Sequence, residues 1–103
     1  MTEYKKTISL DRRHASAHNG LGLILFDGAK FDEAILEFQE ALMADPRHLA
    51  RNNLGKALKA KSKYEDAAAE FRRVLATYPR NRTAQEELDG IETLLADLKD
   101  KRP

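Results

Sequence analysis

The sequence contains no cysteine. That absence excludes a disulfide framework, a zinc site built from thiolates and a cysteine nucleophile. Long apolar runs are absent too: the longest, at residues 21–26, is far shorter than the roughly 20 residues that cross a bilayer. The chain also opens without the basic and apolar segments of a signal peptide. We therefore expect a cytoplasmic protein that is not inserted in a membrane, or a periplasmic one if the sequence is a fragment without its leader.

The chain also lacks an excess of charge of either sign. Its 18 basic and 17 acidic residues give a formal net charge of +1. Nucleic-acid binders normally carry a strongly basic domain or face, so we expect no nucleic-acid partner. With 103 residues, of which 42% are hydrophobic, the chain is long enough for one domain with one continuous core.

An internal repeat is the most informative feature that is present. Identical or similar residues recur 33 positions apart, at Leu21/Leu54, Gly22/Gly55, Leu25/Leu58, Phe31/Tyr64, Ala34/Ala67, Phe38/Phe71, Leu42/Leu75 and Pro46/Pro79. Leucine next to glycine, with another leucine three positions on, gives one helix an inner face that a neighbour can approach closely. Alanine followed four positions later by an aromatic residue gives the inner face of a second helix. The prolines end that second helix, because proline disfavours helical geometry in the residue before it.

These residues resemble the tetratricopeptide repeat family, whose pattern is W-x2-L-G-x2-Y, then A-x3-F, then P. The copies read His18-x2-Leu21-Gly22-x2-Leu25, Ala34-x3-Phe38, Pro46 and Arg51-x2-Leu54-Gly55-x2-Leu58, Ala67-x3-Phe71, Pro79. His18 and Arg51 replace the tryptophan, and leucines replace the tyrosine. The usual turn glycine is displaced to Gly28 in one copy and replaced by Ser62 in the other. The resemblance implies an all-α fold, a right-handed solenoid of helical hairpins.

The repeat register divides the chain into one domain with four parts: a half-repeat helix (1–14), repeat 1 (15–47), repeat 2 (48–81) and a capping helix with a tail (82–103). Helices are expected at about 2–10, 15–27, 31–44, 48–60, 64–77 and 83–100. Tyr4, Ile8 and Asp11 match the second helix of a repeat, so the chain is either a piece of a longer array or begins with a half-repeat. Thr83 and Glu86 have the spacing of a capping box at the start of the last helix.

Two motifs that could indicate a metal site or a phosphate-binding loop are explained more simply by their positions in the repeat. His14 and His18 lie four residues apart, but no nearby carboxylate or cysteine completes a metal site. Gly20-Leu21-Gly22 falls inside a helix, not between a strand and a helix as in a phosphate-binding loop. We expect no metal, no cofactor and no enzymatic activity.

Charge is distributed unevenly along the chain. Residues 46–63 carry six basic and no acidic residues, whereas residues 84–100 have a net charge of −5. In a stack of repeats the first helices are neighbours, so the basic helix and the acidic last helix should lie side by side. Their charges could neutralise each other, with each exposed pair contributing about 0–1 kcal/mol. Alternatively, Lys56 and Lys59 could face the groove and attract an acidic partner.

The resemblance implies a concave groove lined by the first helix of each repeat. Carried over by position, the groove residues are Ser16, Asn19, Leu23, Phe26, Leu49, Asn52, Lys56 and Lys59. We predict that a protein or peptide partner, possibly acidic, binds at Asn19, Leu23, Phe26, Asn52, Lys56 and Lys59, which would make the chain an adaptor or scaffold. Leu23 and Phe26 could instead pack under the N-terminal half-repeat.

Two other functions are weighed against this one. Some members of the family clamp the terminal carboxylate of chaperone tails. Of the matching positions here, Asn19, Leu23, Asn53, Thr83 and Glu87, only Asn53 agrees, and Glu87 would repel a carboxylate. The second alternative is a structural self-assembly module, in which the uncovered N-terminal ends of two stacks pair as a homodimer.

Overall fold

The computed structural model describes residues 12–100, which form five α-helices and no strand. The helices are α2 (Arg12–Asp27), α3 (Phe31–Ala44), α4 (Ala50–Ala60), α5 (Tyr64–Thr77) and α6 (Arg82–Asp100). This confirms the expected all-α fold. The half-repeat helix expected over residues 2–10 lies outside the described residues.

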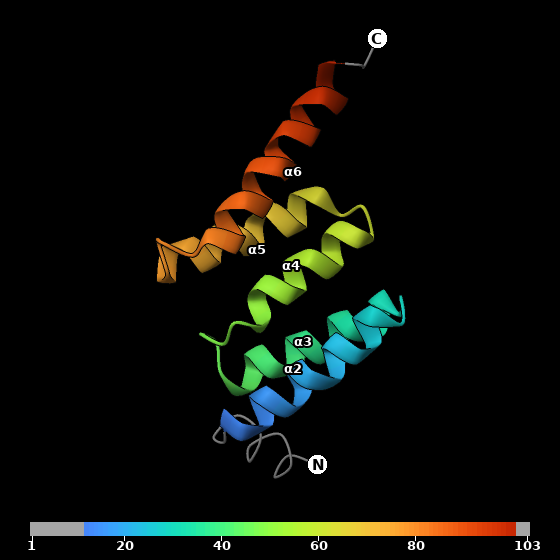
Figure 1. Ribbon diagram of the computed structural model, residues 1–103, viewed down its shortest axis with the longest axis vertical. Helices are drawn as coiled ribbons and strands as arrows, with labels where there is room; N and C mark the ends of the chain where they lie inside the picture. Colours follow the sequence, from blue (N-terminus) through green and yellow to red (C-terminus); the bar gives the residue numbers. More distant parts are fainter. Residues whose placement is uncertain (1–11, 101–103) are drawn as a thin grey trace.

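The helices form two antiparallel hairpins, α2–α3 and α4–α5, followed by α6. Each helix packs on the next along the chain, and the first helices also contact one another, α2 with α4 and α4 with α6. In Figure 1 the helices α2, α4 and α6 form one layer and α3 and α5 form the other. The molecule is elongated along the stack, at 52 × 29 × 22 Å. It is a solenoid of helical hairpins, as the repeat predicts.

A glycine–phenylalanine contact closes each hairpin. Gly22 of α2 lies against the ring of Phe38 of α3, and Gly55 of α4 lies against the ring of Phe71 of α5. A Cβ atom added at Gly55 would stand 2.6 Å from Cζ of Phe71, closer than atoms can approach without displacement. Both rings are fully buried. Glycine is therefore required at this position, because any side chain would push the two helices apart.

The core consists of two clusters joined in the middle of the stack. One surrounds Phe38 and extends from α2 to α4, and the other surrounds Phe71 and extends to α6. Leu58 packs against both clusters. Both are rich in buried alanine, so the helices pack closely around one large aromatic ring per hairpin.

The turn inside each hairpin places a residue other than glycine in the left-handed region. Ala29 and Ser62, 33 positions apart, have φ values of 60° and 63°. The amide of Lys30 donates to the carbonyl of Leu25, and that of Lys63 donates to Leu58, each five residues back as in a Schellman motif. The left-handed residue of the first turn is therefore Ala29 and not Gly28, since no glycine in residues 12–100 has positive φ.

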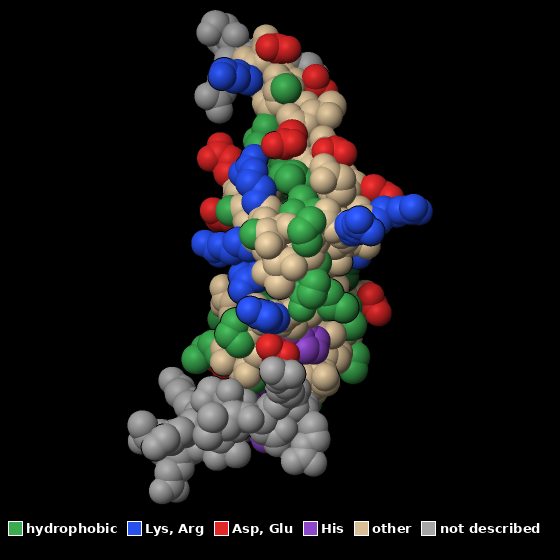
Figure 2. Space-filling model, turned by 90° about the vertical axis from the view of Figure 1, so that its left-hand side faces the viewer, with side chains coloured by type: hydrophobic (Ala, Val, Ile, Leu, Met, Phe, Trp, Pro, Cys, Tyr) green, Lys and Arg blue, Asp and Glu red, His purple; other side chains and the backbone are tan. Residues whose placement is uncertain are grey.

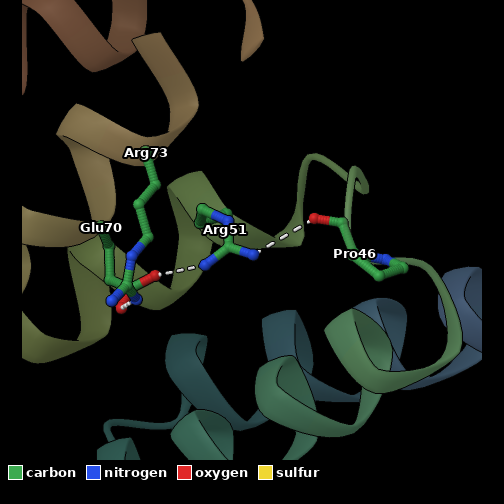
Figure 3. Close-up of polar contacts among 4 residues, drawn as sticks. All are labelled: Pro46, Arg51, Glu70 and Arg73. Carbon is green, nitrogen blue, oxygen red and sulfur yellow. Dashed lines mark hydrogen bonds and ion pairs between the residues drawn. The ribbon is translucent and has the colours of Figure 1, made fainter. Parts of the chain in front are cut away.

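An acid–base pair occupies the position where the family pattern has tryptophan. Nη1 of Arg51 in α4 donates to Oε1 of Glu70 in α5 at 2.8 Å, and Nη2 donates to the carbonyl of Pro46 at 3.2 Å (Figure 3). Glu70 also accepts a hydrogen bond from Arg73 at 2.9 Å. In the first hairpin, His18 and Glu37 repeat the pair at 2.8 Å. The first and second helices of each hairpin are thus linked by a polar contact.

Three helix starts differ from those expected, and that of α4 is at Ala50 rather than near residue 48. Helix α2 already includes Arg12, the first described residue, so it extends at least three residues before the expected start near residue 15. Helix α6 begins at Arg82, and Oδ1 of Asn81 accepts a hydrogen bond from the amide of Ala84 at 2.9 Å. Asn81 therefore caps α6, and the predicted capping role of Thr83 is wrong.

Membrane-spanning and metal-binding features are both absent from residues 12–100. None of the described helices is both long and apolar enough to cross a membrane. No group of three or more histidine and acidic side chains in the same residues is arranged to hold a metal ion.

Candidate functional site

The first helices of the stack are joined by polar side chains. Nδ2 of Asn53 in α4 donates to Oδ1 of Asn19 in α2 at 2.8 Å. Lys59 of α4 pairs with Glu87 of α6 at 2.8 Å between Nζ and Oε1. These contacts hold α2, α4 and α6 side by side (Figure 1). The basic and acidic helices are therefore neighbours, as their positions in the repeat predict.

Two adjoining hollows lie along these helices. The first, of about 220 Å³, is lined by Leu23, Phe26, Asp27, Phe38, Asn53 and Lys56. The second, of about 340 Å³, includes Phe26, Lys56, Lys59, Tyr64, Glu87 and Leu94 in its lining. Phe26 and Lys56 line both. We call the two hollows together the groove.

Phe26 is the aromatic centre of the groove. Its ring packs edge to face on Phe31, with centroids 5.2 Å apart and an interplanar angle of 71°. Such a contact contributes about 0.5–1.5 kcal/mol beyond the buried area. Leu23, one turn earlier in α2, is 40% exposed in the first hollow. The groove thus presents a half-buried aromatic ring and an accessible aliphatic side chain.

The two lysines of the groove differ in their surroundings. Lys59 is paired with Glu87, whose side chain is 23% exposed. Within residues 12–100, Lys56 has neither an ion pair nor a side-chain hydrogen bond. Lys56 lines both hollows, the first together with Asp27 and the second together with Glu87. The charge of Lys59 is therefore neutralised by Glu87, whereas the charge of Lys56 has no partner among the described residues.

Of the six predicted binding residues, four line the groove: Leu23, Phe26, Lys56 and Lys59. Asn19 is half-buried beside it, where it accepts the bond from Asn53. Asn52 differs: it is only 8% exposed, and its Nδ2 donates to Oδ1 of Asn81 at 3.2 Å. Its side chain joins α4 to the start of α6 and does not face the groove.

Some groove residues are missed by the repeat register. Tyr64 begins α5, and Leu94 and Glu87 belong to α6. Tyr64 was missed because the repeat pattern places it in a second helix. Glu87 and Leu94 were missed because the expected groove included only the first helices of the two full repeats. Ser16 and Leu49 were included by position, but neither lines the two hollows. Leu49 lines a different pocket, together with Pro46, Val74 and Tyr78.

Comparisons with known proteins agree with the repeat. Residues 15–48 match one family model described as tetratricopeptide repeat, and residues 52–88 match a second model with the same description. No curated protein matches the sequence. Among solved structures, the chain is similar to the first tetratricopeptide-repeat domain of Spaghetti (RPAP3), solved bound to the HSP90 peptide SRMEEVD. That likeness has 24% identity and a TM-score of 0.46, and covers 85% of this chain and 98% of the other.

The two family matches fall on the two hairpins, and their tight glycine–phenylalanine contacts are the ones that the repeat pattern requires. The chain belongs to the tetratricopeptide repeat family, and it is a protein-interaction module built on a helical repeat fold that generally lacks catalytic activity.

Proposed function

We propose that the groove binds a protein segment that carries an apolar side chain next to a carboxylate, and that the chain works as an adaptor for that partner. The observation that carries the proposal is the position of Lys56 between two hollows that share the ring of Phe26. An apolar side chain of the partner would pack on Leu23 and Phe26. Its neighbouring carboxylate would then lie within reach of the Lys56 ammonium group.

The balance of energies favours this combination of residues. An apolar side chain that becomes fully buried contributes about 1.5–3 kcal/mol. An exposed ion pair contributes only about 0–1 kcal/mol, so Lys56 would select the partner more than it would hold it. Leu23 and Phe26 are thus the expected anchor site. Asn52 is excluded from the proposed surface because it is buried against Asn81.

A displayed library of random peptides, selected on the immobilised full chain, tests the proposal. The expected consensus is an aromatic or aliphatic residue with Asp or Glu within a few positions. Binding of the selected peptide should fall about ten-fold or more in Phe26→Ala, since a hot-spot truncation costs at least about 1–2 kcal/mol.

The charge requirement has a matched control. Lys56→Glu should weaken the same peptide, and Lys63→Glu, which makes the same change of charge outside the groove, should have little effect. A consensus rich in basic residues, or equal loss in the two variants, would contradict a carboxylate site at Lys56.

A further inference from the structure

Within residues 12–100, no other helix covers the apolar face of α2 that lies away from α4. Leu21 and Ile24 are 45% and 70% exposed. Their equivalents 33 positions later, Leu54 and Ala57, are 4% and 0% exposed in the core cluster shared with α2 and α3. On α4, this face is covered by the first hairpin. On α2, no other helix of residues 12–100 covers the equivalent face. We call Ala17, Gly20, Leu21 and Ile24 the outer face of α2.

The outer face is not shaped to receive another hairpin of the same design. In α4 the contact with the preceding hairpin uses Asn53, which bonds to Asn19, and Ala57, which is fully buried. The corresponding residues of α2 are Gly20 and Ile24. Gly20 cannot form the hydrogen bond that Asn53 forms. Ile24 places a branched side chain where α4 has only the methyl group of Ala57. A second hairpin stacked in the same way would be overpacked at Ile24.

The two ends of the stack also differ in charge. The four residues that define the outer face of α2 are all uncharged. At the other end, α6 is acidic, and Figure 2 shows acidic side chains most frequent over the upper part of the molecule, which α6 forms. Head-to-tail stacking would bury carboxylates of α6 against an apolar surface, which is costly because each would lose its water. The outer face of α2 is therefore better matched to itself than to α6.

We propose that two copies of this chain form a two-fold symmetric dimer, with the outer face of α2 in one copy packed on the same face in the other. Gly20 would allow the two α2 helices to approach closely, because it has no side chain and no atom of another helix lies within 4 Å of the place where its Cβ would be. A two-fold contact uses the same surface twice and closes on itself, so no filament grows.

The dimer would leave both grooves open. Leu21 and Leu23 lie about 200° apart around α2, since each residue turns the helix by about 100°. Leu23 lines the groove and Leu21 lies on the outer face, so one helix serves both surfaces. The dimer would therefore present two grooves and bind a partner with two copies of the recognised segment more tightly than a partner with one. The dimer does not depend on what the groove binds.

Light scattering and sedimentation of the full chain over a range of concentrations test the dimer. The expected mass is twice that of the monomer, and Ile24→Glu should weaken association at least ten-fold with unchanged helicity. Leu36→Glu is the matched control, because Leu36 of α3 is 62% exposed and lies outside the outer face. A monomer at all concentrations, a mass that rises without limit, or an Ile24→Glu variant that still dimerises would overturn the proposal.

Because the chain has no cysteine, a single introduced thiol reports on symmetry. Ile24→Cys should form a disulfide-linked dimer on mild oxidation, and Leu36→Cys should form far less under the same conditions. Equal cross-linking of the two variants would overturn the α2 contact. A monomeric full chain in which Ile24→Glu lowers the melting temperature would show that another part of the chain covers the face, and would also overturn it.

Discussion

Arg51 of α4 binds Glu70 of α5 at 2.8 Å, at the position where the family pattern has a tryptophan. His18 and Glu37 make the equivalent contact at 2.8 Å in the first hairpin. The chain thus replaces an apolar contact with a polar one in both hairpins. Glu70 is 13% exposed and accepts hydrogen bonds from two arginines, so it is the better enclosed of the two glutamates.

Glu70→Ala should destabilise the fold by about 1–3 kcal/mol, because it leaves the Arg51 guanidinium partly buried without its acceptor. Chemical denaturation monitored by circular dichroism measures the loss. The matched control is Glu92→Ala, which breaks a pair with Arg72 whose side chains are both more than half exposed. That change should stay within about 0.5 kcal/mol. Equal effects of the two changes would mean that the Arg51–Glu70 contact is no stronger than a surface pair.

Gly55→Ala should destabilise the fold by about 1–3 kcal/mol, because the added Cβ would stand 2.6 Å from Cζ of Phe71 and force the hairpin open. Gly90→Ala in α6 should have the opposite sign, since nothing lies within 4 Å of its added Cβ. Removing glycine from the inside of a helix then stabilises by about 0.5–1 kcal/mol. Free energies of unfolding compare the two directly. A neutral Gly55→Ala would show that the helices are less closely packed than described.

Ala29→Gly should stabilise the protein, because Ala29 has a φ of 60°, which costs a residue with a Cβ about 1–2 kcal/mol. For a domain of this size, about 1 kcal/mol raises the melting temperature by roughly 4–8 °C. Ala96→Gly, at an exposed position inside α6, is the control and should destabilise by about 0.5–1 kcal/mol. If both substitutions lowered the melting temperature, the left-handed turn at Ala29 would be refuted.

Glu87→Gln should strengthen binding of an acidic peptide to the groove, because it releases Lys59 from its ion pair and removes a negative charge from the second hollow. A gain of about 1 kcal/mol corresponds to roughly a five-fold lower Kd. Glu86→Gln makes the same change of charge on an exposed part of α6 that does not line the groove. Calorimetric titration of both variants separates the local effect from a general change in net charge. An equal gain in both would locate the effect in net charge alone.

The repeat register predicts most of the fold, because the spacing of glycine, alanine and phenylalanine determines which faces pack. The expected helices at residues 31–44 and 64–77 have the observed bounds. The register also predicts that the basic and acidic first helices are neighbours, as the Lys59–Glu87 pair shows.

Side-chain direction is harder to predict from position alone. Asn52 and Asn53 are adjacent in sequence, but Asn52 turns toward Asn81 and Asn53 toward Asn19 and the groove. One step along a helix rotates a side chain by about 100°, so a small error in register exchanges a buried residue for an exposed one. The pairing of Arg51 with Glu70 was missed for a different reason: the family pattern places an apolar residue at that position, and it predicts nothing about a charged one.

The central claim is that α2 and α4 bind a partner through one groove, and mapping of amide chemical shifts with a peptide selected on the full chain tests it most directly. The largest changes should fall on Leu23, Phe26, Asn53 and Lys56, and the exposed residues Leu36 and Met43 of α3 should not respond. Changes confined to α3 and α5, with none at Phe26 and Lys56, would contradict the account.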